Sequence, residues 1–335
     1  MLITPGRAER PDQFEMRDWE PHGPDGCPFC EGHESDTPPE LDADRPDGSA
    51  PDGPGWLTRS VPNLYPALVP EEDVESGKDA ESEAGAFAST ADPLLASSRS
   101  AEPDMFASRP AIGHHDVVIN SPRHIQSIGQ LEPAELEVVV AAWRRRMNAR
   151  ADAPYVQLIL NEGPDSGASL EHSHAQIGAS PFVPASVARE RERFNSYRER
   201  TAGASLLGEV LREEIRRGDR LVAIDDEVAL ICPWASRFPY EMRIIPRRPQ
   251  ARFEDDEGGA DMLGRAIRGL NELFGKQPQL NLWVKTAPRG VEHFHWHLDL
   301  VPRLEPSSSF EMATGVDINV ISPEKAAESL REAMS

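Results

Sequence analysis

The sequence predicts an α+β protein with a mainly antiparallel sheet, built from two halves that repeat one another. The first observation is an order of apparent elements that occurs twice: a strand, a helix, a second strand and a group of histidines. The second is spacing, because Pro122 and Pro246 lie 124 residues apart and His172 and His295 lie 123 apart. A repeated unit of this length indicates an internal duplication, and mixed strands and helices favour an α+β body. The alternative is a coincidence of two generic strand-helix-strand passages.

We expect the first half at residues 1–184 and the second at residues 185–335. Residues 1–70 predict short strands and loops, with one strand near 55–61. Residues 71–108 are acidic and rich in Ser, Ala and Pro, without an apolar period. Such a segment cannot bury enough apolar surface to order itself, so it predicts a mobile insertion with no catalytic role.

Each repeat then contributes the same three elements. Runs of apolar and β-branched residues predict the strands, and the longer passages between them predict one helix in each repeat. The predicted elements are a strand at 116–119, a helix at 133–150 and a strand at 155–160, followed by a strand at 241–245, a helix at 258–274 and a strand at 280–285.

Composition excludes several classes of function. The chain of 335 residues has 57 acidic and 35 basic residues and a net charge of -22, which argues against nonspecific nucleic-acid binding and against an anionic membrane surface. No apolar run approaches the length that crosses a bilayer, and no signal peptide precedes the polar stretch at 7–12. Three cysteines are too few for a secreted disulfide framework. We therefore expect a cytoplasmic protein without nucleic-acid or membrane partners.

The most informative stretch is His172-Ser173-His174-Ala175-Gln176, which follows the apolar strand at 155–160. In a strand, residues two apart share a face, so the two imidazoles and the amide would project together. The loop at 161–169 adds Gly, Ser and Asn donors that can cradle a phosphate. This combination predicts a histidine nucleophile that attacks phosphorus; the alternative is a hydrogen-bonded pair at a loop. No P-loop or dinucleotide fingerprint occurs.

Cys27 and Cys30 have the C-x-x-C spacing that lets two thiolates bind one tetrahedral zinc. Two further ligands must come from elsewhere. The candidates are histidines 33, 114, 115, 124 and 172. A redox dithiol is a weaker alternative, because the motif follows a Pro- and Gly-rich loop instead of opening a helix after a strand. A structural turn with two free thiols is the other.

Taken in order, these motifs resemble the galactose-1-phosphate uridylyltransferases and their nucleotidyltransferase relatives within the histidine triad superfamily. The similarity extends over nearly the whole chain. The residues that carry it are 5–11 (Pro-Gly-Arg-Ala-Glu-Arg-Pro), the C-x-x-C pair, 117–124, the histidine motif, 233–241 and Phe310-Glu311. The resemblance implies two fused histidine-triad-like halves, each a mainly antiparallel sheet with packed helices, of which only the first retains the nucleophile.

The resemblance also implies roles for individual residues. His174 would attack the α-phosphorus of a nucleoside diphosphate sugar, and Gln176 would hold a nonbridging phosphate oxygen. The other substrate contacts that it implies are Asn161 and Ser169 at the phosphate, Asn63 near the nucleoside, Glu311 at the sugar hydroxyls, and Arg7 and Arg10 near the sugar phosphate. It further implies a nucleoside diphosphate sugar and a sugar 1-phosphate as partners, and a homodimer with shared sites.

For the metal, the resemblance selects Cys27, Cys30, His124 and His172 as ligands of a structural zinc, with a full ligand set that leaves no open position. A second metal of some members would map to Glu190, His295 and His297. The sequence lacks a further histidine at the expected place ahead of His293, so we expect that site to be weak or empty, with the late histidines packed in a strand.

The expected function is UDP-glucose:hexose-1-phosphate uridylyl transfer, with galactose 1-phosphate as the acceptor, by double displacement through His174. Ser173 and Ala175 occupy the variable motif positions in a form seen in relatives that act as adenylyl-sugar phosphorylases. The alternative is therefore a phosphorylase that acts on an ADP-sugar or a dinucleoside polyphosphate and transfers an adenylyl group to phosphate. A zinc-stabilised nucleotide-binding protein without catalysis is the alternative from another class.

Overall fold

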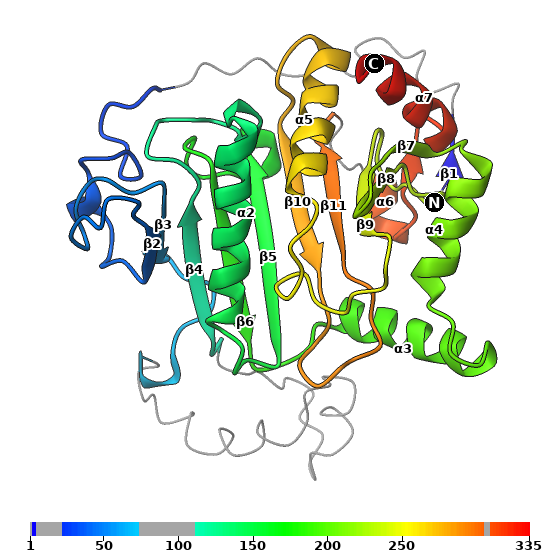
Figure 1. Cartoon of the computed structure of the whole chain (residues 1–335), viewed down its shortest axis with the longest axis horizontal. Helices are drawn as coiled ribbons and strands as arrows, with labels where there is room; N and C mark the ends of the chain where they lie inside the picture. The colour runs from blue at the N-terminus through cyan, green and yellow to red at the C-terminus, as the bar shows by residue number, and fades with distance from the viewer. Residues whose placement is uncertain (1, 5–21, 74–110, 305–308) are drawn as a thin grey trace.

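The computed structural model describes residues 2–4, 22–73, 111–304 and 309–335. Its centre is one ten-stranded sheet in which every neighbouring pair is antiparallel (Figure 1). The strand order is β2-β3-β4-β6-β5-β10-β11-β9-β8-β7. The strands are β2 (Asp42–Asp44), β3 (Thr58–Pro62), β4 (His114–Ile119), β5 (Tyr155–Glu162), β6 (His174–Ser180), β7 (Leu221–Ile224), β8 (Val228–Ile231), β9 (Met242–Pro246), β10 (Leu280–Lys285) and β11 (His297–Pro302).

The order of strands is mirrored about the pair formed by β5 and β10. Five strands on one side come from the first repeat and five on the other from the second. This is the arrangement that an internal duplication produces. The expected α+β class with a mainly antiparallel sheet is confirmed, while the division at residue 184 stays a prediction because the sheet continues from one half into the other without a break.

Helices lie on both faces of the sheet, and two short strands pair apart from it. In Figure 1, α2 lies across the strands of the first half and α5 across those of the second. The helices are α2 (Pro133–Asn148), α3 (Ala185–Arg200), α4 (Leu206–Arg217), α5 (Ala260–Phe274), α6 (Ser309–Thr314) and α7 (Pro323–Ala333). The two short strands, β1 (Leu2–Ile3) and β12 (Ile318–Asn319), pair in parallel.

Alternation along the central strands separates the main core from the functional face. Leu158 and Leu160 of β5 and Ala175 and Ile177 of β6 are fully buried in the cluster that contains α2 and α5. The alternate residues of these strands, such as Asn161 and Gln176, therefore point to the opposite face. In the first half this second face is partly covered by the loop that carries Cys27; in the second half, residues of α4 pack on β8 and β9.

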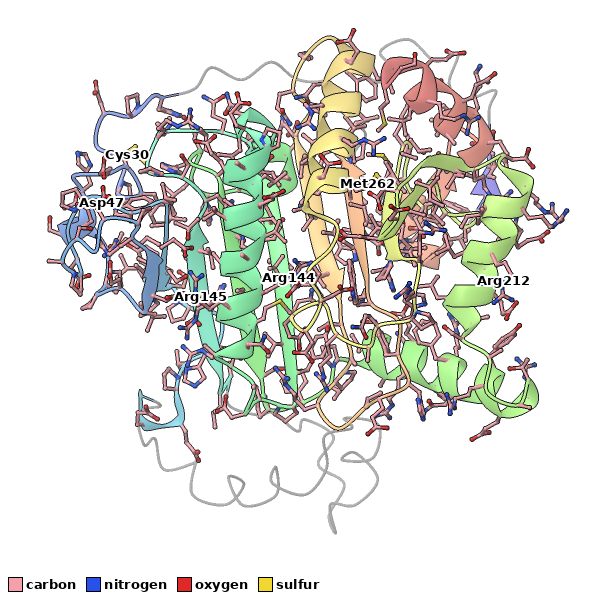
Figure 2. The ribbon with its side chains drawn as sticks, in the orientation of Figure 1. Cys30, Asp47, Arg144, Arg145, Arg212 and Met262 are labelled. Atoms are coloured by element: carbon pink, nitrogen blue, oxygen red, sulfur yellow. The ribbon has the colours of Figure 1, made fainter. Side chains whose placement is uncertain are left out.

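Arg144 of α2 joins the two halves. Its guanidinium is buried and donates to the backbone carbonyls of Phe253, Glu257 and Gly258, which precede α5. Figure 2 labels it between the two helices, with Cys30 at the first half's edge and Arg212 on α4 at the far side. Each of its three nitrogens donates to one of these carbonyls, so Arg144 links α2 of the first half to the segment before α5 of the second.

The predicted elements are present with small shifts at their ends. The helix predicted at 133–150 is α2, which begins at Pro133 where Glu132 and Glu135 form a reciprocal capping box. The helix predicted at 258–274 begins later, at Ala260, because Gly259 has a left-handed φ of 98°.

Of the predicted insertion at 71–108, Glu71–Asp73 form a 3-10 turn and the remainder lies outside the described residues. No described helix is both long and apolar enough to span a bilayer.

Candidate active site and metal centre

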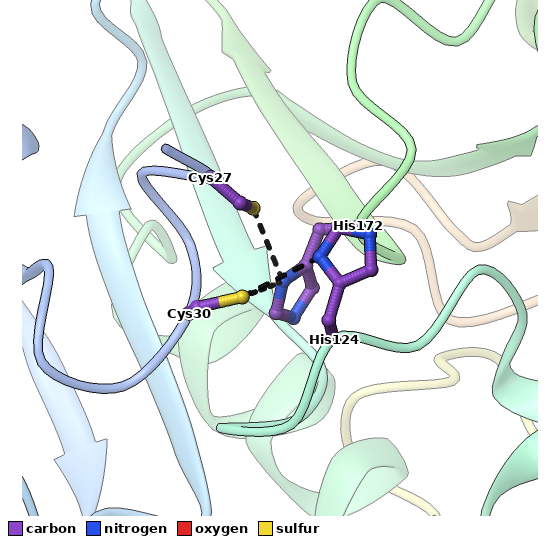
Figure 3. A group of neighbouring side chains, drawn as sticks. All are labelled: Cys27, Cys30, His124 and His172. Carbon is purple, nitrogen blue, oxygen red and sulfur yellow. Dashed lines mark hydrogen bonds between the residues drawn. The ribbon is translucent and has the colours of Figure 1, made fainter. Parts of the chain in front are cut away.

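Two cysteines and two histidines meet where the N-terminal loop contacts the sheet (Figure 3). Their candidate ligand atoms, which belong to Cys27, Cys30, His124 and His172, all lie within 4.8 Å of one another. The structure thus brings together the four residues that the family resemblance selects.

The distances in this cluster fit a tetrahedral ion. His172 Nδ1 lies 3.5 Å from Cys27 Sγ and 3.6 Å from Cys30 Sγ, and His124 Nδ1 lies 3.4 Å from Cys30 Sγ. Zinc bonds of about 2.3 Å to sulfur and about 2.0 Å to nitrogen at tetrahedral angles place S and N about 3.5 Å apart. The geometry and the soft donor set therefore suit zinc, and these four residues could hold it.

The protonation of the cluster residues also suits a bound metal ion. His172 Nε2 donates to the Ser121 carbonyl at 2.8 Å, which leaves the Nδ1 lone pair directed at the thiols. Burial lowers the pKa of His172 to about 4, so the ring is a neutral ligand. Burial, together with the adjacent Cys27 thiol, raises the pKa of Cys30 to about 12. A cation bound there would favour the thiolate and release its proton.

His174, the predicted nucleophile, is the first residue of β6 and lies two residues after the metal-cluster residue His172. Its Nδ1 lies 2.8 Å from the His172 carbonyl, to which it donates, so the lone pair is on Nε2. That atom has no hydrogen-bond partner in the described part of the chain. Burial lowers the pKa of His174 below its usual range, so the imidazole is neutral and has the protonation state of a nucleophile. The edge of Phe29, within the C-x-x-C motif, packs on its ring at 5.1 Å between centroids.

Gln176 and Asn161 lie on the same face as His174. Gln176 is two residues farther along β6 and pairs with Ile159 of β5, and the register places Asn161 beside His174. Ser169 lies exposed in the loop between these strands, and Asn63 follows β3 with its Nδ2 at 3.3 Å from His115 Nε2. Three of the predicted phosphate-site residues thus gather around one strand pair, and Asn63 lies beside His115, which contacts Gln176.

The other predicted substrate contacts are elsewhere. Glu311 lies on α6 in the second half. Arg7 and Arg10 lie outside the described residues. Their contact with substrate stays a prediction.

Three residues near the site have no role in the sequence interpretation beyond the naming of His115 as a candidate metal ligand. His115 lies on β4 with its Nε2 at 2.9 Å from Gln176 Oε1 and outside the metal cluster. Asn281 of β10 donates to Asn161. Glu162 is buried behind the motif and accepts from Ser173 Oγ at 2.8 Å. No sequence pattern marks His115 and Asn281, because each contacts a residue of a neighbouring strand that is distant in sequence.

The second half presents the late histidines differently. His295 Nε2 lies 2.8 Å from the Pro246 carbonyl, and its Nδ1 is 3.4 Å from Ser205 Oγ. His297 Nε2 lies 3.5 Å from a Glu190 carboxylate oxygen. Glu190 and His297 are therefore near one another, and both histidines are buried in or beside β11, as the packed alternative expects. Among the described residues, however, the ligand atoms of these three do not form a cluster suited to a metal ion.

A cavity of about 1580 Å³ lies on the same face of the sheet, between the second half's strands and the helices α3 and α4. It extends from His297 to Ile159 of β5 and Asn281 of β10. Its lining does not include His174 or Gln176. The cavity therefore borders the candidate site and does not contain its predicted nucleophile.

Comparison with known proteins supports the family resemblance seen in the sequence. The family profile described as galactose-1-phosphate uridyl transferase, N-terminal domain, matches residues 64–184. An ADP-glucose phosphorylase of Arabidopsis thaliana is 30% identical over 99% of this chain and 89% of its own length. A galactose-1-phosphate uridylyltransferase of Haemophilus influenzae is 27% identical over 73% of this chain and 74% of its own.

Among solved structures, an Arabidopsis thaliana ADP-glucose phosphorylase with bound ADP-glucose superposes with a TM-score of 0.75, at 28% identity, over 98% of this chain and 94% of that one. The match covers both halves, including the motif around His174. The chain therefore belongs to the galactose-1-phosphate uridylyltransferase family, whose members are nucleotidyltransferase enzymes that act on sugar phosphates.

Proposed function

We propose that this protein is an ADP-sugar phosphorylase that transfers an adenylyl group to inorganic phosphate through a covalent intermediate on His174. The observation that carries the proposal is the hydrogen bond from His174 Nδ1 to the His172 carbonyl, which directs the lone pair of the opposite nitrogen away from the backbone. The whole-chain similarity to an ADP-glucose phosphorylase supports the adenylyl group as the one transferred.

In the first step, Nε2 of neutral His174 attacks the α-phosphorus of the ADP-sugar. A nitrogen–phosphorus bond forms and the bond to the sugar 1-phosphate oxygen breaks, so sugar 1-phosphate leaves. In the second step, an oxygen of inorganic phosphate attacks the same phosphorus, releases His174 and forms ADP. The amides of Gln176 and Asn161 lie on the same face and would stabilise the charge on the nonbridging oxygens in both steps.

Cys27, Cys30, His124 and His172 would hold zinc in a structural role, and the ion would supply rigidity instead of Lewis acidity because four protein ligands fill its shell. His172 contributes its side chain to this cluster and its carbonyl to His174 Nδ1. The position of the predicted nucleophile therefore depends on the order of the metal cluster.

A second candidate is uridylyl exchange between hexose 1-phosphates, which the sequence interpretation puts first. The profile match and the relatives named galactose-1-phosphate uridylyltransferase favour it. Both candidates use the same first step on His174, and they differ in the base and in the acceptor. We also propose that Asn63, Ser169, Glu311, Arg7 and Arg10 contact the substrate, and that the protein is a homodimer with shared sites.

The test separates the base from the acceptor. The protein is mixed with ADP-glucose or with UDP-glucose, and the intact mass is measured before and after the addition of phosphate or galactose 1-phosphate. We expect an adenylyl adduct that phosphate removes as ADP. A uridylyl adduct discharged by galactose 1-phosphate would replace this proposal with the second candidate. Absence of any adduct, with no release of sugar 1-phosphate, would refute both.

A further inference from the structure

Two carboxamides flank the predicted nucleophile, Gln176 on the same strand and Asn161 on the neighbouring one. A carboxamide has one end that accepts hydrogen bonds and one that donates, and only the donating end attracts a phosphate oxygen. The usefulness of each amide therefore depends on which end faces the site. In this structure the orientation of both amides can be traced to a backbone group, whose polarity is unambiguous.

For Gln176, the orientation comes from His115. The backbone N–H of Ala67 donates to His115 Nδ1 at 3.0 Å, so Nδ1 carries a lone pair and the proton of the neutral ring is on Nε2. Nε2 lies 2.9 Å from Gln176 Oε1 and donates to it. With that proton in place, the longer 3.3 Å contact from Asn63 Nδ2 to the same nitrogen joins two donors and does not compete.

For Asn161, the orientation comes from Asn281. Asn281 Nδ2 donates to the backbone carbonyl of Ser166 at 2.8 Å, which identifies that end of the side chain as the amide nitrogen. The same nitrogen lies 2.7 Å from the Asn161 side chain, so the Asn161 atom that faces it is the oxygen. The two residues also pair directly in the register of β5 and β10.

Both amide oxygens are thus occupied, while neither amide nitrogen has a hydrogen-bond partner in the described part of the chain. We infer that His115 and Asn281 are positioning residues that orient Gln176 and Asn161 so that both amide NH2 groups face the transferred phosphoryl group. This inference rests on the proposed function, because it concerns the site at which nucleotidyl transfer would occur. Pre-oriented donors stabilise developing charge without reorganisation during the reaction.

Asn281 gives the second half a part in the chemistry of the first. It belongs to β10, the strand at which the second half joins the sheet, while His174 and Asn161 belong to the first half. The second half therefore does more than cover the first half's edge strand. It supplies the donor that sets the direction of one phosphate-site amide.

The experiment measures the single-turnover rate of adduct formation with ADP-glucose, by intact mass, and the KM at steady state. Asn281→Asp keeps the shape of the side chain but removes the donor. Asn148→Asp is the matched control, because Asn148 Nδ2 donates to a backbone carbonyl, that of Glu254, at the same 2.8 Å, at the end of α2. We expect Asn281→Asp to slow adduct formation about 10²-fold and Asn148→Asp to leave it near the wild-type rate.

His115 is tested with a rescue and a double variant. His115→Gln can still donate from the position of Nε2 and should stay within about 3-fold of wild type, whereas His115→Phe cannot and should lose about 10²-fold. In a Gln176→Ala background, His115→Phe should add less than about 2-fold, because a residue that acts only through Gln176 has nothing left to orient. His114→Phe is the neighbouring control.

The outcomes are distinct. Equal rates for Asn281→Asp and Asn148→Asp, or an undiminished effect of His115→Phe in the Gln176→Ala background, would overturn the positioning role in an active enzyme. If His115→Phe or Asn281→Asp fails to fold, His115→Gln with Gln176→Ala still decides, since a loss of activity in His115→Gln alone contradicts the inference. A wild-type protein that forms no adduct with any sugar nucleotide overturns the proposed function itself.

Discussion

His174 in the first half and His297 in the second begin strands that correspond in the mirrored sheet, β6 and β11. Each Nδ1 faces the carbonyl of the histidine two residues earlier, at 2.8 Å for His174 and 3.3 Å for His297. The two differ at the opposite nitrogen. Nε2 of His297 meets Glu190 of α3 at 3.5 Å, whereas Nε2 of His174 has no such neighbour among the described residues.

The residues two positions before and two positions after each histidine also differ between the halves. His172 turns its Nδ1 toward two thiols, and His295 turns the same atom toward the hydroxyl of Ser205. Two residues beyond each histidine stand Gln176 and Asp299. Asp299 is a buried carboxylate that accepts from Arg243 and Trp283, and unlike an amide it has no N–H to donate to a phosphate oxygen.

The comparison teaches that corresponding histidines can keep the same backbone contact in different surroundings. Both halves keep the imidazole and its backbone hydrogen bond, and the differences lie in the partners that determine what the imidazole can reach. In the first half, Nε2 of His174 has no hydrogen-bond partner among the described residues, and the Gln176 amide lies on the same face of the strand. In the second half, the Glu190 carboxylate lies 3.5 Å from the ring nitrogen of His297, and Arg243 pairs with Asp299 two residues farther on.

The difference between the halves is tested most directly by replacing each of the two histidines, in separate variants, with a residue that cannot attack phosphorus. We expect His174→Asn to lower the rate of adduct formation by about 10⁴-fold or more, because the nucleophile is removed. The matched variant His297→Asn should stay within a few-fold of wild type. Intact-mass kinetics with ADP-glucose measures both, and comparable losses in the two variants would show that the halves are not divided as described.

The metal cluster provides the next largest expected effect. Cys27→Ser should lower the bound zinc and reduce the melting temperature by on the order of 10 °C, because a structural metal contributes folding free energy. Cys232→Ser, in the second half's core and outside the cluster, should retain the zinc. Elemental analysis with thermal unfolding measures both. If Cys27→Ser kept its metal and its melting temperature, the four-ligand cluster would be wrong.

Gln176→Glu makes the first half resemble the second by placing a carboxylate two residues beyond the histidine. We expect a loss of about 10² to 10³-fold in kcat, because the shape is kept while a donor is replaced by a negative charge beside the phosphate. Gln157→Glu, on the same face of β5 but bonded to the carbonyls of Leu158 and Val284, is the control. Steady-state kinetics with ADP-glucose and phosphate measures both variants, and a wild-type kcat for Gln176→Glu would contradict the proposed role of the amide.

The smallest expected effect concerns Glu162, a buried carboxyl behind the histidine motif. The corresponding position in the second half is the buried Thr286. Burial raises the pKa of Glu162 to about 7 from 4.5, so the folded protein keeps a proton that the unfolded chain loses. The free energy of unfolding should therefore fall as pH rises from about 4.5 to 7, by about 3 kcal/mol in total for a shift of this size.

Glu162→Gln should remove that dependence, so the variant gains on wild type between about pH 5 and pH 8. Urea unfolding at both values measures it, with the exposed Glu137→Gln as a variant that should keep the wild-type slope. A parallel pH dependence in wild type and Glu162→Gln would assign the effect to another group.

A zinc-stabilised binding protein without catalysis is the remaining alternative from the sequence interpretation. It requires the histidine motif to serve the fold alone. His172 and His295 do have that structural character, because both nitrogens of each ring have partners. His172 contacts the Ser121 carbonyl and the two thiols, and His295 contacts the Pro246 carbonyl and the Ser205 hydroxyl. His174 does not, and membership in an enzyme family argues in the same direction.

Much of the fold followed from local pattern. The strand at Tyr155–Glu162 and the helix at Pro133–Asn148 were predictable because apolar runs and a proline at the first turn act within a few residues. The pairing of β5 with β10 was not predictable, because it joins residues more than a hundred positions apart and no local signal marks which strands become neighbours. His115 and Asn281 stayed without a role for the same reason.

By itself, the sequence determined the duplicated α+β plan and the C-x-x-C pair, because repeat offsets and motif spacing carry that information along the chain. The family resemblance selected the other two ligands of the metal cluster and supported the prediction of His174 as the nucleophile. Only the tertiary structure showed how the surroundings of the two corresponding histidines differ. This difference depends on side chains that folding brings together from distant parts of the chain. The Glu190 carboxylate lies 3.5 Å from His297 Nε2, whereas His174 shares a strand face with Gln176, whose amide contacts His115.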